Sequence, residues 1–103
     1  MANRIDPALV AVAYRTTGLI PVQGWSGSMA SGTACGLSAV CVAAGRDHPS
    51  GWIDPWWLLS RELELAPEYV RDFTDGFDGH PGDSDGYADG HAAWALVSGE
   101  DVG

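Results

Sequence analysis

Aspartates and glycines crowd residues 72–90, with six Asp and five Gly among nineteen positions. Within this segment, Asp83, Asp85 and Asp89 follow a D-x-D-G-x-x-D spacing. A hard cation takes carboxylate and carbonyl oxygens from a tight loop, and glycine permits the turn. One hypothesis is therefore a calcium-binding module at Asp83, Asp85 and Asp89. The alternative is a helix N-cap with a negatively charged first turn, which the helix dipole favours.

A cysteine and a histidine form the second candidate pair. Cys35-Gly36 lies at a predicted helix start, where the dipole favours a thiolate. Gly90-His91 precedes an apolar run. The two stretches resemble papain-like peptidases of the type that process bacteriocin leaders, in which a Cys-Gly opens a helix and a Gly-His opens a strand. The resemblance implies a cysteine hydrolase with Cys35 as nucleophile, His91 as general base and Asp101 as the orienting acid.

The same cysteines have a purely structural interpretation. Leu37 follows Gly36 where that family usually has proline, and the residues between the two stretches predict helices rather than strands. Cys35 and Cys41 are then small buried residues of a core helix, since cysteine is among the most buried residue types. Six positions apart on a helix, they point about 120° away from each other and cannot share a metal ion. We expect no cofactor and no metal site from them.

The five tryptophans are the third group of interest. Exposed tryptophans commonly anchor protein interfaces. Trp56 and its neighbour Trp57 cannot both face one narrow helix stripe, because adjacent helical residues lie about 100° apart. Trp25 falls in a loop rich in serine and glycine. Trp25, Trp52 and Trp56 are the predicted contact residues for a partner.

Start and stop signals place these residues on short helices. Asp6-Pro7 and Asp54-Pro55 each put an N-cap before a proline at the first helical position. Thr33 is the predicted cap of a helix that runs through Ala44. Residues 19–32 are predicted to form a loop, with a short strand at Leu19 to Val22 as the alternative. Pro67 starts another helix, and Asp83 or Ser84 caps the last. Glycines at 18, 45 and 79 supply the stops.

Hydrophobic spacing then assigns the buried faces. The last helix is predicted to bury Tyr87, His91, Trp94 and Ala95. Residues 73–77 and 87–91 share an aromatic-small-Asp-Gly-ring pattern, and their glycines would allow two helices to approach closely. The prediction is an all-α fold: residues 1–103 as one domain of four to five short helices, with a helical hairpin at about 54–78.

Composition limits the function classes. The chain has 103 residues, 46% hydrophobic, with a formal net charge of −9 and no lysine. This charge argues against binding nucleic acid, since phosphate contacts require basic side chains. No apolar run approaches the length of a membrane span, and the N-terminus lacks the layout of a signal peptide. We therefore expect a cytoplasmic, acidic protein-interaction or regulatory domain, rather than an enzyme, that binds a protein partner or forms a homo-oligomer.

Overall fold

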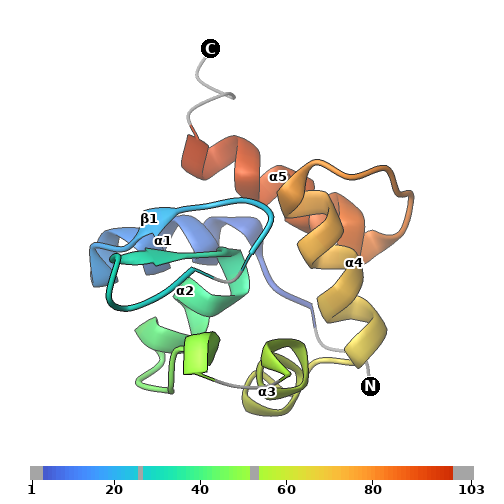
Figure 1. The fold of residues 1–103 in the computed structure, drawn as a ribbon. Helices are drawn as coiled ribbons and strands as arrows, with labels where there is room; N and C mark the ends of the chain where they lie inside the picture. Colours follow the sequence, from blue (N-terminus) through green and yellow to red (C-terminus); the bar gives the residue numbers. More distant parts are fainter. Residues whose placement is uncertain (1–3, 26, 52–53, 99–103) are drawn as a thin grey trace.

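Five α-helices dominate the part of the chain that the structure describes. The computed structural model describes residues 4–25, 27–51 and 54–98 (Figure 1). The helices are α1 (Pro7–Thr17), α2 (Gly36–Ala43), α3 (Pro55–Glu62), α4 (Pro67–Asp78) and α5 (Asp85–Ser98). Strands β1 (Ile20–Pro21) and β2 (Thr33–Ala34) form a small parallel pair, and η1 (Pro49–Gly51) is a 3₁₀ turn. The predicted all-α class is confirmed, with α3 and α4 as the helical hairpin.

Three of the helix starts are fixed by side-chain caps. A carboxylate oxygen of Asp6 accepts the Ala8 N–H at 2.9 Å, and one of Asp54 accepts the Trp57 N–H at 3.0 Å. The Ser84 hydroxyl accepts the Tyr87 N–H at 3.1 Å. Each cap satisfies a backbone donor that lacks a partner in its own helix, and such caps contribute about 1 kcal/mol each. No described helix is long and apolar enough to cross a membrane.

The predicted cap at Thr33 is wrong. Thr33 pairs with Ile20 in the parallel sheet, and α2 begins three residues later with Cys35 at the N-cap position. The Thr33 N–H donates to the Ser28 carbonyl at 3.0 Å. Its carbonyl oxygen contacts the His48 ring nitrogen Nε2 at 3.0 Å. Because the backbone of Thr33 bonds to residues outside the helix, Thr33 belongs to the strand and does not cap α2.

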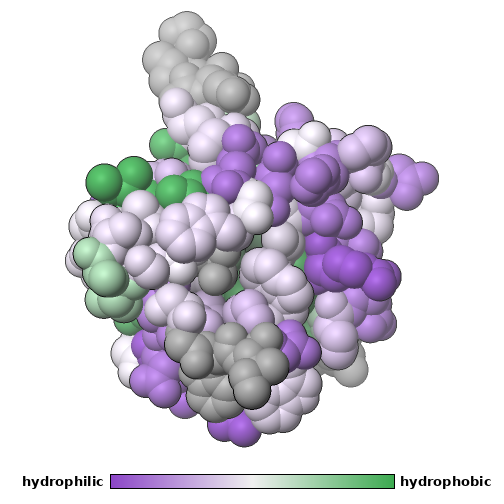
Figure 2. Space-filling view, in the orientation of Figure 1, coloured by the Kyte–Doolittle hydropathy of each residue, from purple (hydrophilic) through white to green (hydrophobic). Residues whose placement is uncertain are grey.

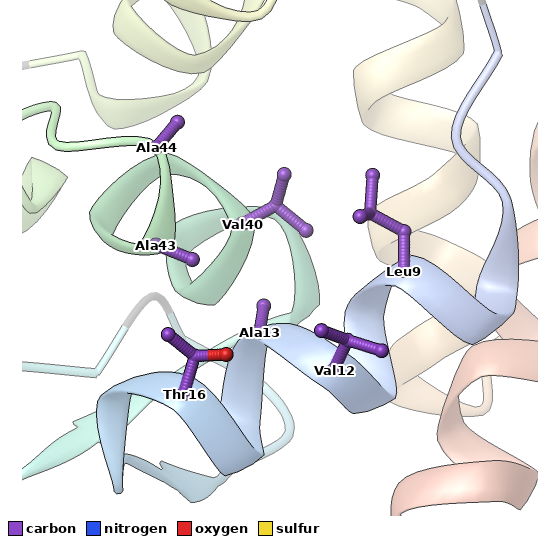
Figure 3. Close-up of a pocket in the computed structure, with 7 residues that line it drawn as sticks. All are labelled: Leu9, Val12, Ala13, Thr16, Val40, Ala43 and Ala44. Carbon is purple, nitrogen blue, oxygen red and sulfur yellow. The ribbon is translucent and has the colours of Figure 1, made fainter.

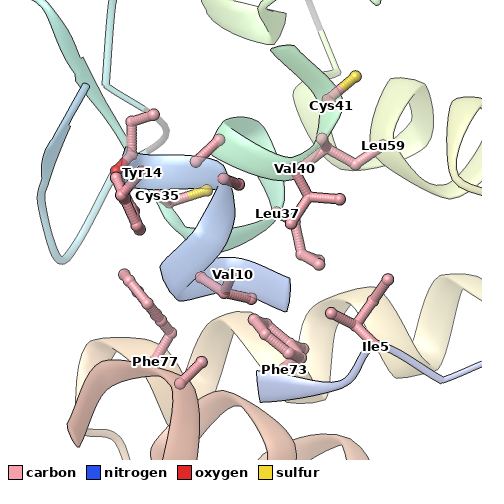
Figure 4. Packing of buried hydrophobic residues seen from close by; sticks show 14 of the residues in the cluster. Ile5, Val10, Tyr14, Cys35, Leu37, Val40, Cys41, Leu59, Phe73 and Phe77 are labelled. Atoms are coloured by element: carbon pink, nitrogen blue, oxygen red, sulfur yellow. The ribbon is translucent and has the colours of Figure 1, made fainter. Parts of the chain in front are cut away.

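The core lies where α1, α2 and α4 meet. Phe73 and Phe77 of α4 point toward Val10 of α1, with Leu37 of α2 on the far side (Figure 4). All residues of α2 from 36 to 41 are buried. Helix α2 is thus enclosed over most of its length, and its C-terminal end alone reaches the surface.

Helices α4 and α5 pack through glycines. A Cβ atom at Gly90 would overlap the Phe73 carbonyl oxygen, and one at Gly76 would overlap the Tyr87 carbonyl oxygen. This close approach confirms the prediction from the repeated pattern. The buried face predicted for α5 is only partly right, because the helix turns its glycines toward α4, while Trp94 still packs against Phe77 with ring centres 5.2 Å apart. Its buried residues are Gly86, Asp89, Gly90 and Ala93, while His91 is exposed.

Candidate functional site

An apolar groove separates α1 from α2 on the surface. Its volume is about 270 Å³, and its lining contains no charged side chain. Figure 3 shows the side chains of both helices pointing toward the space between them. The lining residues are Leu9, Val12, Ala13 and Thr16 of α1, Val40 and Ala43 of α2, and Ala44, which follows α2. The groove is therefore a hydrophobic surface that the folded chain leaves uncovered.

Exposure distinguishes the walls of the groove from its floor. Leu9 is 47% exposed and Val12 is 43% exposed, so α1 presents two large apolar side chains to solvent. Ala13 and Val40 are buried and close the bottom. Ala43 and Ala44 are exposed but small. Small residues beside large exposed ones give a concave, apolar surface, which is the usual shape of a binding site.

Thr16, Val40, Ala43 and Ala44 of the groove lie in a stretch of the sequence that has no charge, whereas the lining residues of α1 before Thr16 precede that stretch. Residues 16–45 contain no Asp, Glu, Lys, Arg or His, and Asp6 is the sole acidic residue before them. Figure 2 shows hydrophobic residues gathered near β1, while hydrophilic residues cover the side formed by α4 and the segment that follows it. On the face in view, the hydrophobic residues near β1 and the hydrophilic residues around α4 thus lie on different sides. This uncharged run contains the α2 side of the groove, but it does not mark Leu9 and Val12 of α1.

The predicted tryptophan contacts fall in three different situations. Trp25 is 51% exposed in the loop between β1 and β2. Trp56 is half-buried and packs against the core, while Trp57 is 50% exposed with the Arg61 guanidinium 5.1 Å from its ring centre. Trp52 lies outside the described residues. Trp25 and Trp56 do not line the groove between α1 and α2.

A rigid turn presents Trp25. The hydroxyls of Ser28, Ser31 and Thr33 are linked at 2.8 Å and 2.7 Å. Gly27 has a φ of 80°, and a Cβ atom there would overlap the Thr33 carbonyl. Only glycine fits such a position without displacing the neighbouring strand. The loop is therefore held by its own hydrogen bonds.

Cys35 and His91 do not form a nucleophile-base pair in the described structure. The Cys35 thiol is buried and lies 3.1 Å from the Ser38 hydroxyl. Burial raises the pKa of this thiol, which is the opposite of what an activated nucleophile needs. His91 is exposed, and its ring stacks on Tyr87. Asp101 lies outside the described residues. The arrangement gives the thiol no base.

The three aspartates of the calcium hypothesis do not converge. Asp83 and Asp85 are exposed, whereas Asp89 is buried. The Asp89 carboxylate accepts two hydrogen bonds from Arg4, at 2.9 Å and 3.1 Å, and one from the Tyr69 hydroxyl. Among the described residues, no three His, Cys, Asp or Glu side chains are placed to hold a metal ion.

Sequence reasoning missed this contact between the two ends of the described chain. The Tyr69 hydroxyl also accepts the Ile5 N–H at 2.9 Å, so α4 holds both α5 and the segment before α1. Burial and the bond to Asp89 raise the pKa of Tyr69 to about 12, which keeps the hydroxyl protonated and able to donate. We call Arg4, Tyr69 and Asp89 the N-terminal clamp. It braces α1, which forms one wall of the groove.

A second buried carboxylate joins the loop of Trp25 to the end of α4. Asp78 Oδ1 is buried and has no hydrogen-bond partner in the described structure. Desolvation raises the pKa of Asp78, and a hydrogen bond from the Gly24 backbone partly offsets that effect. The Gln23 side-chain amide donates to the Phe77 carbonyl at 2.8 Å. These contacts position the loop on the core.

Comparison with known proteins gives no relative from which a site could be transferred. No protein-family model matches the chain, and neither a curated protein nor a solved structure matches it. The groove, its walls and the charge distribution around it are therefore the observations from which a function can be argued.

Proposed function

We propose that this domain binds a helix of a protein partner in the groove between α1 and α2. The observation that carries the proposal is an uncharged apolar groove bounded by Leu9 and Val12, two large exposed side chains. Burying a Leu or Val side chain contributes roughly 1.5–3 kcal/mol. Two such anchors beside a concave floor supply the hydrophobic centre that protein interfaces require.

The shape of the groove favours a helix over an extended peptide. Peptides that bind as strands add to an exposed sheet edge. The described strands β1 and β2 have two residues each and offer almost no edge. The groove instead follows α1 from Leu9 to Thr16, which is about 10 Å along a helix axis. A partner helix would fill it with about two turns, using apolar side chains at i, i+3 or i+4, and i+7.

A display selection tests this proposal. A library of helical peptides of about 18 residues, with Leu, Ile, Met and Val varied along one face, is selected against the wild-type protein. Peptides that bind wild type are then measured against Leu9→Gln and Val12→Gln. We expect each substitution to weaken binding about tenfold, because each removes an apolar anchor without changing net charge.

Leu96→Gln is the matched control. Leu96 is 45% exposed on α5, close to the 47% of Leu9, but it lies outside the groove. Glutamine at position 9 also keeps α1 stable, since the third helical residue after an Asp cap accommodates Gln in a capping box. Peptides that lose affinity equally for Leu9→Gln and Leu96→Gln, or a selection that yields no binders sensitive to Leu9, would contradict the proposal.

A further inference from the structure

We infer that the partner helix is basic on both sides of its apolar stripe, so that its cationic side chains reach the carboxylates at the ends of the groove. The inference rests on the proposed function and specifies the chemistry of the partner. The inference follows from the contrast between the uncharged lining of the groove and the carboxylates near its ends.

Exposed carboxylates stand near both helix ends that border the groove. Asp6 caps α1, three residues before Leu9, and Asp47 follows Ala44 by three residues. Glu62 of α3 adds a further carboxylate near the end of α2, 3.7 Å from Arg46. A partner with Lys or Arg outside its apolar stripe would place positive charge near Asp6 and Asp47 while its stripe fills the groove.

The arginines near the groove do not reverse this pattern. Arg46 lies beside the Glu62 carboxylate, so its positive charge is partly compensated. Arg15 is on α1, but it lines the hollow on the other side of that helix, with Tyr14, Pro21 and Leu96. Arg4 is engaged by Asp89 in the N-terminal clamp. Arg4 and Arg46 are thus each beside a carboxylate, and Arg15 lines a hollow other than the groove.

The net charge of the whole chain acts in the same direction. At −9 and without lysine, the protein attracts cationic partners over long range and repels a second copy of itself. Such fields raise association rates for partners of opposite charge and disfavour those of like charge. An uncharged lining avoids burying a carboxylate without a partner, which would be costly. Apolar contacts then give affinity, and the surrounding acidic residues select the partner.

The composition of selected peptides tests this inference. The same library encodes Lys, Glu and Gln with equal frequency at the positions that flank the apolar stripe. We expect peptides that depend on Leu9 to be enriched in Lys at these flanks. For one such peptide, replacing its flanking Lys residues by Glu should weaken binding at least tenfold at about 50 mM salt. The loss should shrink at about 500 mM salt, where screening is strong.

The outcomes separate the two proposals. Binders that depend on Leu9 but show neutral or acidic flanks would overturn the basic partner and leave the helix-binding groove in place. No binder that depends on Leu9 would overturn the proposed function itself. Self-association of the wild type that is lost in Leu9→Gln, measured by sedimentation, would identify a second copy as the occupant and overturn the basic partner. Asp47→Asn, which is expected to lower affinity for basic peptides alone, checks which carboxylate takes part.

Discussion

The helix pairs α4–α5 and α1–α2 bring helices together with very different side chains. Between α4 and α5, Gly76 and Gly90 let backbone meet backbone, and no room is left for a Cβ atom. Between α1 and α2, Leu9, Val12 and Val40 keep the helix surfaces apart and leave a groove of about 270 Å³. Interaxial distance depends on the side chains at the contact. We call α4–α5 the closed pair, because its glycines allow backbone contact, and α1–α2 the open pair, because a groove remains between its helices.

Charge follows the same division. The closed pair carries the aspartates, and its buried carboxylate Asp89 is fully used by Arg4 and Tyr69. The open pair borders the run of residues 16–45, which has no charged side chain. The contrast teaches that Asp89 of the acidic segment, which draws attention first in the sequence, is used to hold the fold. The segment without charges contributes instead to an uncovered apolar groove.

Replacing a glycine at the α4–α5 contact by a larger residue should have the largest effect on the free energy of unfolding. Gly90→Ala gains about 1 kcal/mol in helix propensity, but its Cβ would overlap the Phe73 carbonyl oxygen and approach the Phe77 nitrogen at 2.9 Å. We expect a net loss of about 3 kcal/mol or more, because backbone cannot move aside as a side chain can. Urea unfolding followed by circular dichroism measures it.

Gly86→Ala is the matched control on the same face of α5. Its Cβ would lie 3.0 Å from the Asp72 Cβ and 3.1 Å from the Tyr69 carbonyl, where small shifts suffice. The expected loss is below about 1 kcal/mol, since helix propensity offsets the crowding. Similar losses for Gly86→Ala and Gly90→Ala would show that the two helices are not in backbone contact.

Removing the hydroxyl at the centre of the N-terminal clamp should come next. Tyr69→Phe deletes the acceptor of the Ile5 N–H, 2.9 Å away, and the donor to Asp89. We expect a loss of about 1–2 kcal/mol in the free energy of unfolding, together with faster hydrogen exchange of the Ile5 amide. Tyr87→Phe is the control, because Tyr87 stacks on His91 without contacting the clamp. Unchanged exchange at Ile5 would contradict the clamp.

A smaller effect, of opposite sign, is expected at the loop contact of α4. Because desolvation raises the folded-state pKa of Asp78 above its ordinary 3.8, ionisation of this carboxyl opposes folding. The penalty is absent below the ordinary pKa and present above the raised one. Asp78→Asn should therefore be slightly more stable than wild type at pH 7, and the gain should vanish near pH 3. Urea unfolding at both values tests it, with exposed Asp83→Asn as the control for net charge.

Filling the groove should have the smallest effect on stability and a clear effect on binding. Ala43→Leu places a larger apolar side chain against Leu9, Val12 and Thr16, so α1–α2 becomes more like a closed pair. We expect a gain of about 0.5 kcal/mol, as in other cavity-filling changes. The affinity for groove-binding helical peptides should fall at least tenfold. Calorimetric unfolding and fluorescence titration measure the two quantities, and unchanged peptide affinity would place the binding site elsewhere.

Local signals in the sequence predicted most of the fold. Asp6-Pro7 and Asp54-Pro55 mark helix starts, and Gly18 and Gly79 mark ends, because capping depends on neighbours in the chain. The prediction of Thr33 as a helix cap failed because its strand partner Ile20 is thirteen residues away. A capping signal contains no information about such a distant strand. The predicted buried face of α5 was partly wrong because apolar side chains were assumed to pack against α4, whereas the glycines of α5 pack there.

The candidate site was less predictable than the fold. A groove depends on how far two helices stand apart, and that distance is set by tertiary packing rather than by either helix alone. Leu9 was not among the predicted contact residues and proves to be a groove wall. The aromatic candidates Trp25 and Trp56 were chosen by residue type. The uncharged run of residues 16–45 was visible in the sequence, but it includes only Thr16 and the α2 side of the groove.

The N-terminal clamp has a consequence for the order in which the chain folds. Arg4 and Asp89 are 85 positions apart, so the clamp cannot close until α5 has been synthesised. Loop closure over that distance is entropically costly, whereas α4 and α5 are close in sequence and can pair early. Until then the apolar side chains of α1 and α2 can contact neighbouring chains. The surface proposed to recognise a partner is also the one that most needs protection from aggregation during synthesis.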